Sequence, residues 1–171
     1  PPPPRGRGSG FLAQALEAHL SALPLAQDPG AKAIGVKISG CPNSCGQHHI
    51  ADIGFYGSSR KVGEREVPHY VLLLGGRTRE GEARFGQVVG RIPARRVPEA
   101  VERILKRYLE ERQNGESFQA YLDRVGAASF KPLLQDLQEV PPYEEAPEFY
   151  QDLGAEGEAF SVQLGRGECA V

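Results

Sequence analysis

The hydrophobic and polar positions of this chain alternate in two different periods. Leucines recur at helical spacing between Phe11 and Leu23, and apolar residues line one face of a longer segment from Val97 to Arg112, where Pro98 suits the first turn of a helix. These two patterns predict amphipathic helices. Shorter helices are expected over 116–124 and 131–137, and apolar or β-branched runs predict strands over 33–39, 51–56, 70–74, 85–92 and 159–164.

The order of these elements predicts the fold class. Strands followed by helices are typical of an α+β fold, here an antiparallel or mixed sheet with packed helices and a helical tail. Gly57-Ser-Ser is interpreted as a turn. Residues 1–9, which open with four prolines, are expected to be a disordered or artificial N-terminus, 10–138 the folded domain and 139–171 an extended C-terminal tail. The absence of Met from all 171 residues favours an internal fragment.

Composition excludes several classes of function. The 20 Lys and Arg nearly balance the 22 Asp and Glu, so no general attraction to nucleic acid or to an anionic membrane follows. No apolar run approaches the roughly 20 residues that cross a bilayer, and no signal peptide opens the chain, which favours the cytoplasm. Three cysteines do not make a disulfide framework, so in a reducing compartment we expect a metal-binding or catalytic role.

The segment from Lys37 to His49 holds two of the three cysteines, Cys41 and Cys45, with three residues between them. It lies between two predicted strands, so one tight loop can present two thiolates to the same inorganic centre. Glycines flank the pair and allow close approach of the backbone. Iron–sulfur clusters are usually held by four thiolates, and only Cys169 remains. The chain therefore predicts a metal site that it does not complete alone.

The run from Ser39 to Phe55 resembles the second cysteine motif of the sirohaem-dependent nitrite and sulfite reductases. The resemblance implies that Cys41 is a ligand of a 4Fe-4S cluster and that Cys45 is shared between this cluster and the sirohaem. It also implies two further thiolates from an upstream Cys-x5-Cys motif. The resemblance extends over residues 10 to about 130, and includes Leu12-Ala-Gln-Ala-Leu16 and Gly115-Glu-Ser-Phe118.

The chain departs from this family just before the helix predicted from Phe11. No cysteine precedes that helix, and the family's basic residues for sirohaem and substrate, which lie mostly further upstream, are missing too. We therefore expect residues 10–138 to be a partial sirohaem and 4Fe-4S domain, in a truncated chain. Cys169 could supply a third ligand, but its polar surroundings favour a free surface thiol.

Other residues of the loop have two interpretations each. Cys41 and Cys45 could instead be half of a zinc site or structural thiols, although the flanking residues favour the cluster. Asn43 and Gln47 are predicted to orient the loop or to contact the cofactor. The two histidines at 48 and 49 could be haem ligands or proton donors, but hydrogen-bonded loop histidines are more common, and no catalytic residue is assigned.

A basic cluster near the start of the long helix is formed by Arg91, Arg95 and Arg96. It is interpreted either as a patch that binds an anion or a partner, or as solvated surface. The second interpretation is favoured, because charged clusters at the surface are common.

The function predicted from the resemblance is the six-electron reduction of nitrite to ammonia, with electrons from ferredoxin or another one-electron donor. Ser44 and the Gln-His-His that follows favour nitrite over sulfite, which is the nearest alternative; dissimilatory relatives share the loop. A fragment without cofactor and catalysis is a further alternative. A small ferredoxin-like carrier is disfavoured, because it needs four cysteines. No nucleic-acid or membrane partner is expected.

Overall fold

The computed structural model of the chain describes residues 7–79, 81–155 and 157–162. A four-stranded sheet in the order β1-β2-β3-β6 forms its centre. The strands are β1 (Val36–Ser39), β2 (Ile53–Val62), β3 (Arg65–Leu74) and β6 (Gln87–Pro93). The β1–β2 pair is parallel and the other two pairs are antiparallel. The predicted α+β fold with a mixed sheet and packed helices is therefore confirmed.

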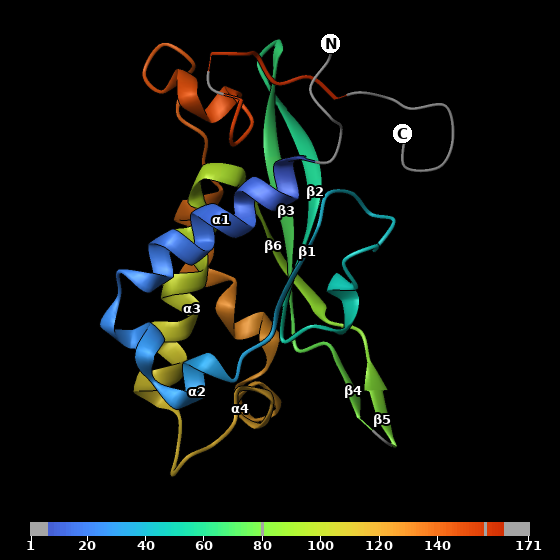
Figure 1. Cartoon of the computed structure of the whole chain (residues 1–171), viewed down its shortest axis with the longest axis vertical. Helices are drawn as coiled ribbons and strands as arrows, with labels where there is room; N and C mark the ends of the chain where they lie inside the picture. Colours follow the sequence, from blue (N-terminus) through green and yellow to red (C-terminus); the bar gives the residue numbers. More distant parts are fainter. Residues whose placement is uncertain (1–6, 80, 156, 163–171) are drawn as a thin grey trace.

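Helices cover one side of this sheet (Figure 1). They are α1 (Arg7–Ser21), α2 (Pro29–Lys32), α3 (Val97–Glu111) and α4 (Phe118–Val125). A two-stranded hairpin of β4 (Arg77–Arg79) and β5 (Glu82–Arg84), which the sequence pattern does not predict, projects from the end of the sheet. The 3-10 turns are η1 (Pro24–Gln27), η2 (His48–Ile50), η3 (Ala94–Arg96), η4 (Ala127–Phe130), η5 (Pro132–Leu134), η6 (Asp136–Gln138) and η7 (Pro147–Tyr150).

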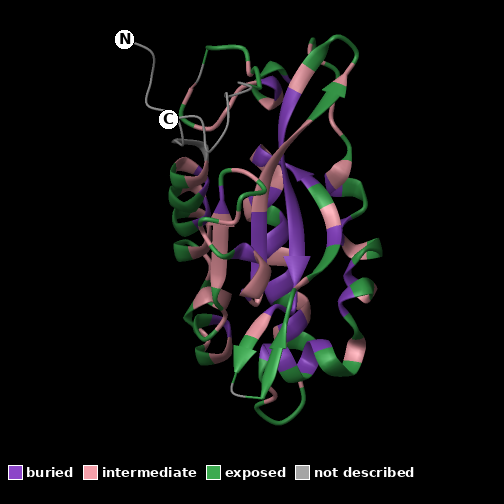
Figure 2. Cartoon of the chain, turned by 90° about the vertical axis from the view of Figure 1, so that its right-hand side faces the viewer, coloured by how far each residue is buried: buried purple, intermediate pink, exposed green. Residues whose placement is uncertain are grey.

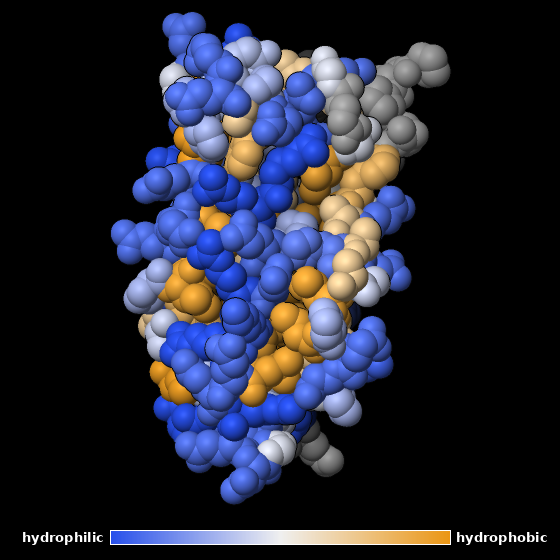
Figure 3. All heavy atoms as spheres, turned by 90° about the vertical axis from the view of Figure 1, so that its left-hand side faces the viewer, coloured by the Kyte–Doolittle hydropathy of each residue, from blue (hydrophilic) through white to orange (hydrophobic). Residues whose placement is uncertain are grey.

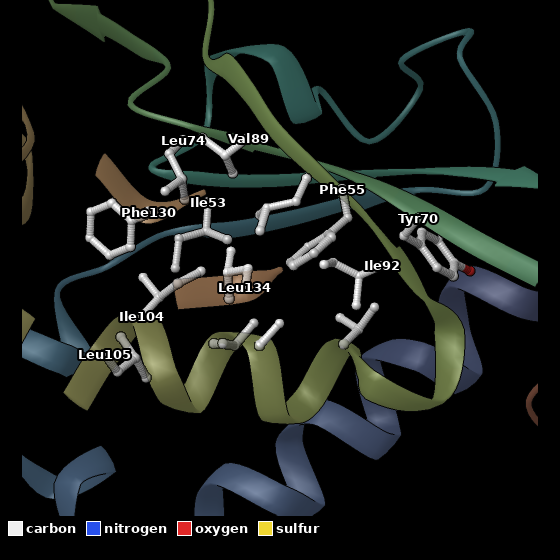
Figure 4. Close-up of a cluster of buried hydrophobic side chains, with 14 of the residues drawn as sticks. Ile53, Phe55, Tyr70, Leu74, Val89, Ile92, Ile104, Leu105, Phe130 and Leu134 are labelled. Carbon is white, nitrogen blue, oxygen red and sulfur yellow. The ribbon is translucent and has the colours of Figure 1, made fainter. Parts of the chain in front are cut away.

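The hydrophobic core lies between the sheet and α3. Because side chains alternate along a strand, Ile53 and Phe55 of β2 point to the same side and meet Ile104 of α3 (Figure 4). All three are fully buried, and burying a side chain of this size stabilises a protein by about 1.5–3 kcal/mol. The outer surface of this helical layer is largely hydrophilic (Figure 3), as the amphipathic pattern of 97–112 predicts.

Strand β2 continues through the residues that were expected to form a turn. Gly57 lies inside β2, and the chain reverses only at Gly63, whose φ is +61°. A Cβ atom on Gly57 would lie 2.2 Å from the carbonyl oxygen of Gly40. The turn prediction at 57–59 is therefore wrong. Gly57 does not reverse the chain; it allows the backbone at Gly40 to approach β2 closely, which is a known role of glycine within a strand.

The ends of the chain also differ from expectation. Helix α1 begins at Arg7, so residues 7–9 of the expected disordered end are helical. Residues 159–162 of the predicted last strand are irregular, because the nitrogen of Phe160 donates to the carbonyl of the buried Tyr150 and not to a strand of the sheet. Positions 163 and 164 of that strand, and Cys169, lie outside the described residues.

Among the helices of the described ranges, none combines the length and the apolar character that crossing a membrane requires.

Candidate metal centre

Cys41 and Cys45 lie in the loop 40–47, which we call the cysteine loop. It leaves the end of β1 and leads through η2 to β2. Because β1 and β2 are parallel, the connection between them must return along the sheet, which needs about a dozen residues. It does so on the side of the sheet away from α3 (Figure 1). Cys41 is half-buried and Cys45 is exposed, so both thiols are accessible at the surface of this segment.

Ser39, the last residue of β1, ties both ends of the cysteine loop together. Its hydroxyl oxygen accepts a hydrogen bond of 3.1 Å from the backbone nitrogen of Gly46 and is hydrogen-bonded at 2.7 Å to Nδ1 of His48. Ser39 is 3% exposed and His48 is fully buried. A single buried hydroxyl at the end of β1 therefore holds two residues that follow Cys45.

Close contacts between backbones hold the cysteine loop against the sheet. A Cβ atom on Gly46 would lie 2.3 Å from the carbonyl oxygen of Ile38, and one on Gly54 would lie 2.0 Å from that of His48. No side chain fits at these positions, because Cβ atoms in proteins essentially never lie so close to another heavy atom. These glycines let the loop and η2 pack directly on β1 and β2.

Polar side chains complete the loop. Lys37 of β1 donates from Nζ to Oε1 of Gln47 at 2.9 Å, and the hydroxyl of Ser44 is hydrogen-bonded to Nδ1 of His49 at 2.8 Å. Ser44 and Gln47 both adopt positive φ angles, 61° and 57°. The predicted residue Asn43 is exposed between the two cysteines. The structure thus places Cys41, Cys45, Asn43 and Gln47 in the same cysteine loop. The proposed roles of the cysteines as ligands, and of Asn43 and Gln47 as cofactor contacts, stay predictions.

The two histidines are hydrogen-bonded loop residues, as the more common interpretation expects. Burial lowers the pKa of His48, and the neighbouring charge of His49 lowers it further. The two rings lie 4.0 Å apart, and His48 also stacks on Tyr56 at 4.8 Å. A neutral, buried His48 therefore acts here as packing and as a partner of Ser39.

Sequence reasoning missed a second anchor of this region, at the start of β2. Oδ2 of Asp52 accepts from the nitrogen of Gly35 at 2.8 Å, and Oδ1 accepts from the amide of the buried Gln119, which also donates to the carbonyl of Gly76 at 2.9 Å. This network joins α4 to the end of the connection that carries the cysteines. Asp52 and Gln119 are 67 positions apart in the sequence, so no local pattern predicts their contact. The only sequence signal for close packing in this region is Gly54, a glycine inside an apolar run.

The donor atoms present fit half of a 4Fe-4S site. Two thiols on one rigid, glycine-flanked loop are suitable ligands for one side of a cluster. Within the described ranges, no group of three or more His, Cys, Asp and Glu side chains gathers where it could hold a metal ion. If the predicted ligand roles hold, the described residues would supply two of the four thiolates that such a cluster usually takes.

Replacing Ser39 with alanine is expected to lower the free energy of unfolding by about 1–3 kcal/mol, because it leaves the buried Nδ1 of His48 without a partner. Urea denaturation of the chain measures this change. Ser21, exposed at the end of α1, is the matched control, and its alanine variant is expected to unfold like the wild type. Equal stability of the two variants would show that the hydroxyl of Ser39 does not hold the loop.

The basic cluster separates into two environments. The side chain of Arg95 donates to the carbonyl of Glu148, and that of Arg96 donates to the carbonyl of Asp136 and lies over the ring of Phe149. These two arginines fasten the C-terminal segment to the domain, which is neither of the roles expected of them. Arg91 lies apart from them, exposed on β6.

Comparison with known proteins gives consistent matches. Residues 27–140 match the family model described as the nitrite and sulphite reductase 4Fe-4S domain. Sulfite reductase (ferredoxin) 1 of Mycolicibacterium paratuberculosis is 33% identical over 95 residues, which are 54% of this chain and 17% of that protein. The sulfite reductase (NADPH) hemoprotein beta-component of Chromohalobacter salexigens is 32% identical over 115 residues, which are 67% of this chain and 18% of that protein.

A solved structure also matches. The structure of the Mycobacterium tuberculosis NirA protein superimposes with a TM-score of 0.56 at 29% identity, and the match covers 68% of this chain and 21% of that one. The chain spans less than a fifth of the length of the two curated relatives described above.

Proposed function

The chain belongs to the nitrite and sulphite reductase 4Fe-4S domain family, and from this premise we propose that it is part of an oxidoreductase that reduces nitrite to ammonia by six electrons. Membership confirms the family predicted from the run Ser39–Phe55. It also confirms the predicted cofactors as those of the family, because the family description names the 4Fe-4S cluster and the Chromohalobacter relative is named a hemoprotein.

The cysteine loop carries this proposal. Cys41 and Cys45 would hold one side of the cluster, and by resemblance Cys45 would be the thiolate shared with sirohaem. When bound, the pair of cofactors supplies single-electron transfer and an iron that binds the substrate anion. The chain contributes rigidity: Ser39 and the glycines at 46 and 54 fix both thiols relative to the sheet, so that little ordering is left for the moment of binding.

Nitrite is the substrate we propose. The residues that favour it, Ser44 and the Gln-His-His that follows, are in direct contact through the hydrogen bond between Ser44 and His49. Sulfite is the second candidate, and a specific observation favours it, since both curated relatives described above are named sulfite reductases.

We propose ferredoxin, or another carrier of single electrons, as the donor. The Mycolicibacterium relative is named for ferredoxin and the Chromohalobacter relative for NADPH. A one-electron carrier matches a site that holds an iron–sulfur cluster, because such a cluster changes its charge by one electron at a time.

The test uses the whole reductase, purified without oxygen. Iron and acid-labile sulfide, with an absorption spectrum, are expected to show both a 4Fe-4S cluster and sirohaem. With reduced ferredoxin, kcat/KM for nitrite is expected to exceed that for sulfite by about tenfold or more. Preference for sulfite would overturn nitrite in favour of the second candidate, and a protein with zinc or no metal would overturn both.

A further inference from the structure

The sheet has a second face, on the side away from α3, and it carries a polar cluster that the cysteine loop does not use. Alternation along the strands places Ser58 and Arg60 of β2 on this face, together with His69 of β3 and Arg91 of β6. Ser58 and His69 are direct partners in the β2–β3 register, and Arg91 is paired with Val71, two residues beyond His69. Figure 2 looks onto this side of the sheet.

Two buried polar atoms in this cluster have no hydrogen-bond partner among the residues that the structure describes. His69 is 1% exposed, and its Nδ1 lies 2.9 Å from the carbonyl oxygen of Val67. Because a carbonyl only accepts, Nδ1 carries the proton and Nε2 is left with an unused lone pair. Nε2 of His69 and the hydroxyl of Ser58 are both buried without a partner among the described residues. Leaving such a group unsatisfied costs about 1–3 kcal/mol, which suggests that something else completes it.

Two positive charges act on His69. Arg60 and Arg91 are exposed, and neither has a carboxylate within 4 Å in the part of the chain that the structure describes. Burial lowers the pKa of His69, and the charges of Arg60 and Arg91 lower it further. By contrast, many arginines elsewhere in the chain are paired with carboxylates, namely Arg77, Arg84, Arg103, Arg107, Arg112 and Arg124.

We propose that Ser58, Arg60, His69 and Arg91 form a binding site for one small oxyanion, in the first place a carboxylate. The two guanidinium groups supply charge-assisted donors, and the hydroxyl of Ser58 supplies a further one. Nε2 of His69 takes one proton from solvent when the anion arrives and becomes the fourth donor. The negative charge offsets the repulsion from the two arginines, which adds to the effect of burial in keeping this imidazole neutral.

Exposed arginines alone would be ordinary solvated surface. The difference here is the pair of buried, unsatisfied atoms on the same face of the sheet, which come from two neighbouring strands in register. A single oxyanion satisfies both atoms and both charges at once. The site is independent of the cysteine loop and does not rest on the proposed reduction of nitrite.

The experiment is an NMR titration of the full 171-residue chain, labelled with nitrogen-15. Sodium acetate and sodium sulfate are added separately, at constant ionic strength and pH. Either ion is expected to shift the Nε2 resonance of His69 to the position of a protonated ring, and to do so with saturation. Half-saturation at lower acetate concentration assigns the site to a carboxylate, and at lower sulfate concentration to an inorganic oxyanion.

Arg91→Gln is expected to raise the half-saturating concentration by about tenfold or more, which is the loss of one charge-assisted hydrogen bond. Arg79→Gln is the matched control, because Arg79 is equally exposed but lies on the β4–β5 hairpin, and it is expected to leave binding unchanged. A shift of His69 that never saturates, or equal weakening by both substitutions, would overturn the proposed site.

Discussion

Replacing Cys45 with serine in the whole reductase is expected to lower protein-bound iron and acid-labile sulfide by about tenfold or more. A serine hydroxyl stays protonated where a thiol gives up its proton, and its oxygen is a much poorer ligand for an iron–sulfur cluster. Cys45 is exposed, so the substitution would remove the proposed ligand without opening a cavity in the core. The same loss is expected for Cys41→Ser, since both thiols belong to one loop.

Cys169→Ser is the matched control for this prediction. It changes the same chemistry in the same chain, and the sequence favours a free surface thiol at that position. Its iron and sulfide content is expected to equal that of the wild type. The assignment of ligands would be wrong if Cys45→Ser kept its cluster, or if all three variants lost it to the same degree. Circular dichroism of each variant checks that the fold is intact.

Replacing Gly54 with alanine is expected to lower the free energy of unfolding by about 2–4 kcal/mol. The added Cβ would lie 2.0 Å from the carbonyl oxygen of His48 and 2.9 Å from its carbonyl carbon. The clashing atoms belong to the backbone of His48, so a change of side-chain rotamer cannot relieve the clash. Gly54 is also paired on both sides, with Lys37 of β1 and Leu73 of β3, so β2 has no room to shift.

Urea denaturation of the chain measures this effect, and Gly10→Ala is its control. Gly10 lies in α1 with nothing within 4 Å of its added Cβ. Alanine there is expected to leave stability unchanged or to raise it by up to about 1 kcal/mol, since glycine disfavours a helix. A change of less than about 0.5 kcal/mol for Gly54→Ala would show that η2 can move away from the sheet.

Much of the fold follows from periodicity in the sequence. Helix α3 was expected over 97–112 and spans Val97–Glu111, because its apolar stripe and Pro98 are local features. Strand β1, the first half of β2 and the buried run of β3 were located for the same reason. Gly57 was misinterpreted as part of a turn because its structural role depends on Gly40. Gly40 lies seventeen positions away in the sequence and approaches Gly57 only in the folded chain.

The candidate site shows the same division. The cysteine pair and the hydrogen-bonded character of His48 could be predicted, since both belong to one short segment. The buried hydroxyl of Ser39 and the amide of Gln119 could not, because their partners are brought to them by the sheet and by α4. The family resemblance predicted the two cysteine ligands; the folded chain shows the contacts that hold their loop against the sheet.

The pairing of the strands also implies an order of assembly. Strands β2 and β3 are joined by the tight turn at Gly63 and form a local antiparallel pair, whereas β1 must reach β2 in parallel across the whole cysteine loop. Contacts that close short loops form early and those that close longer loops form later. We therefore expect the two thiols to take up their final positions late in folding. Cofactor insertion is then expected to follow the docking of β1 on β2, because the loop that would receive the cluster is completed only at that step.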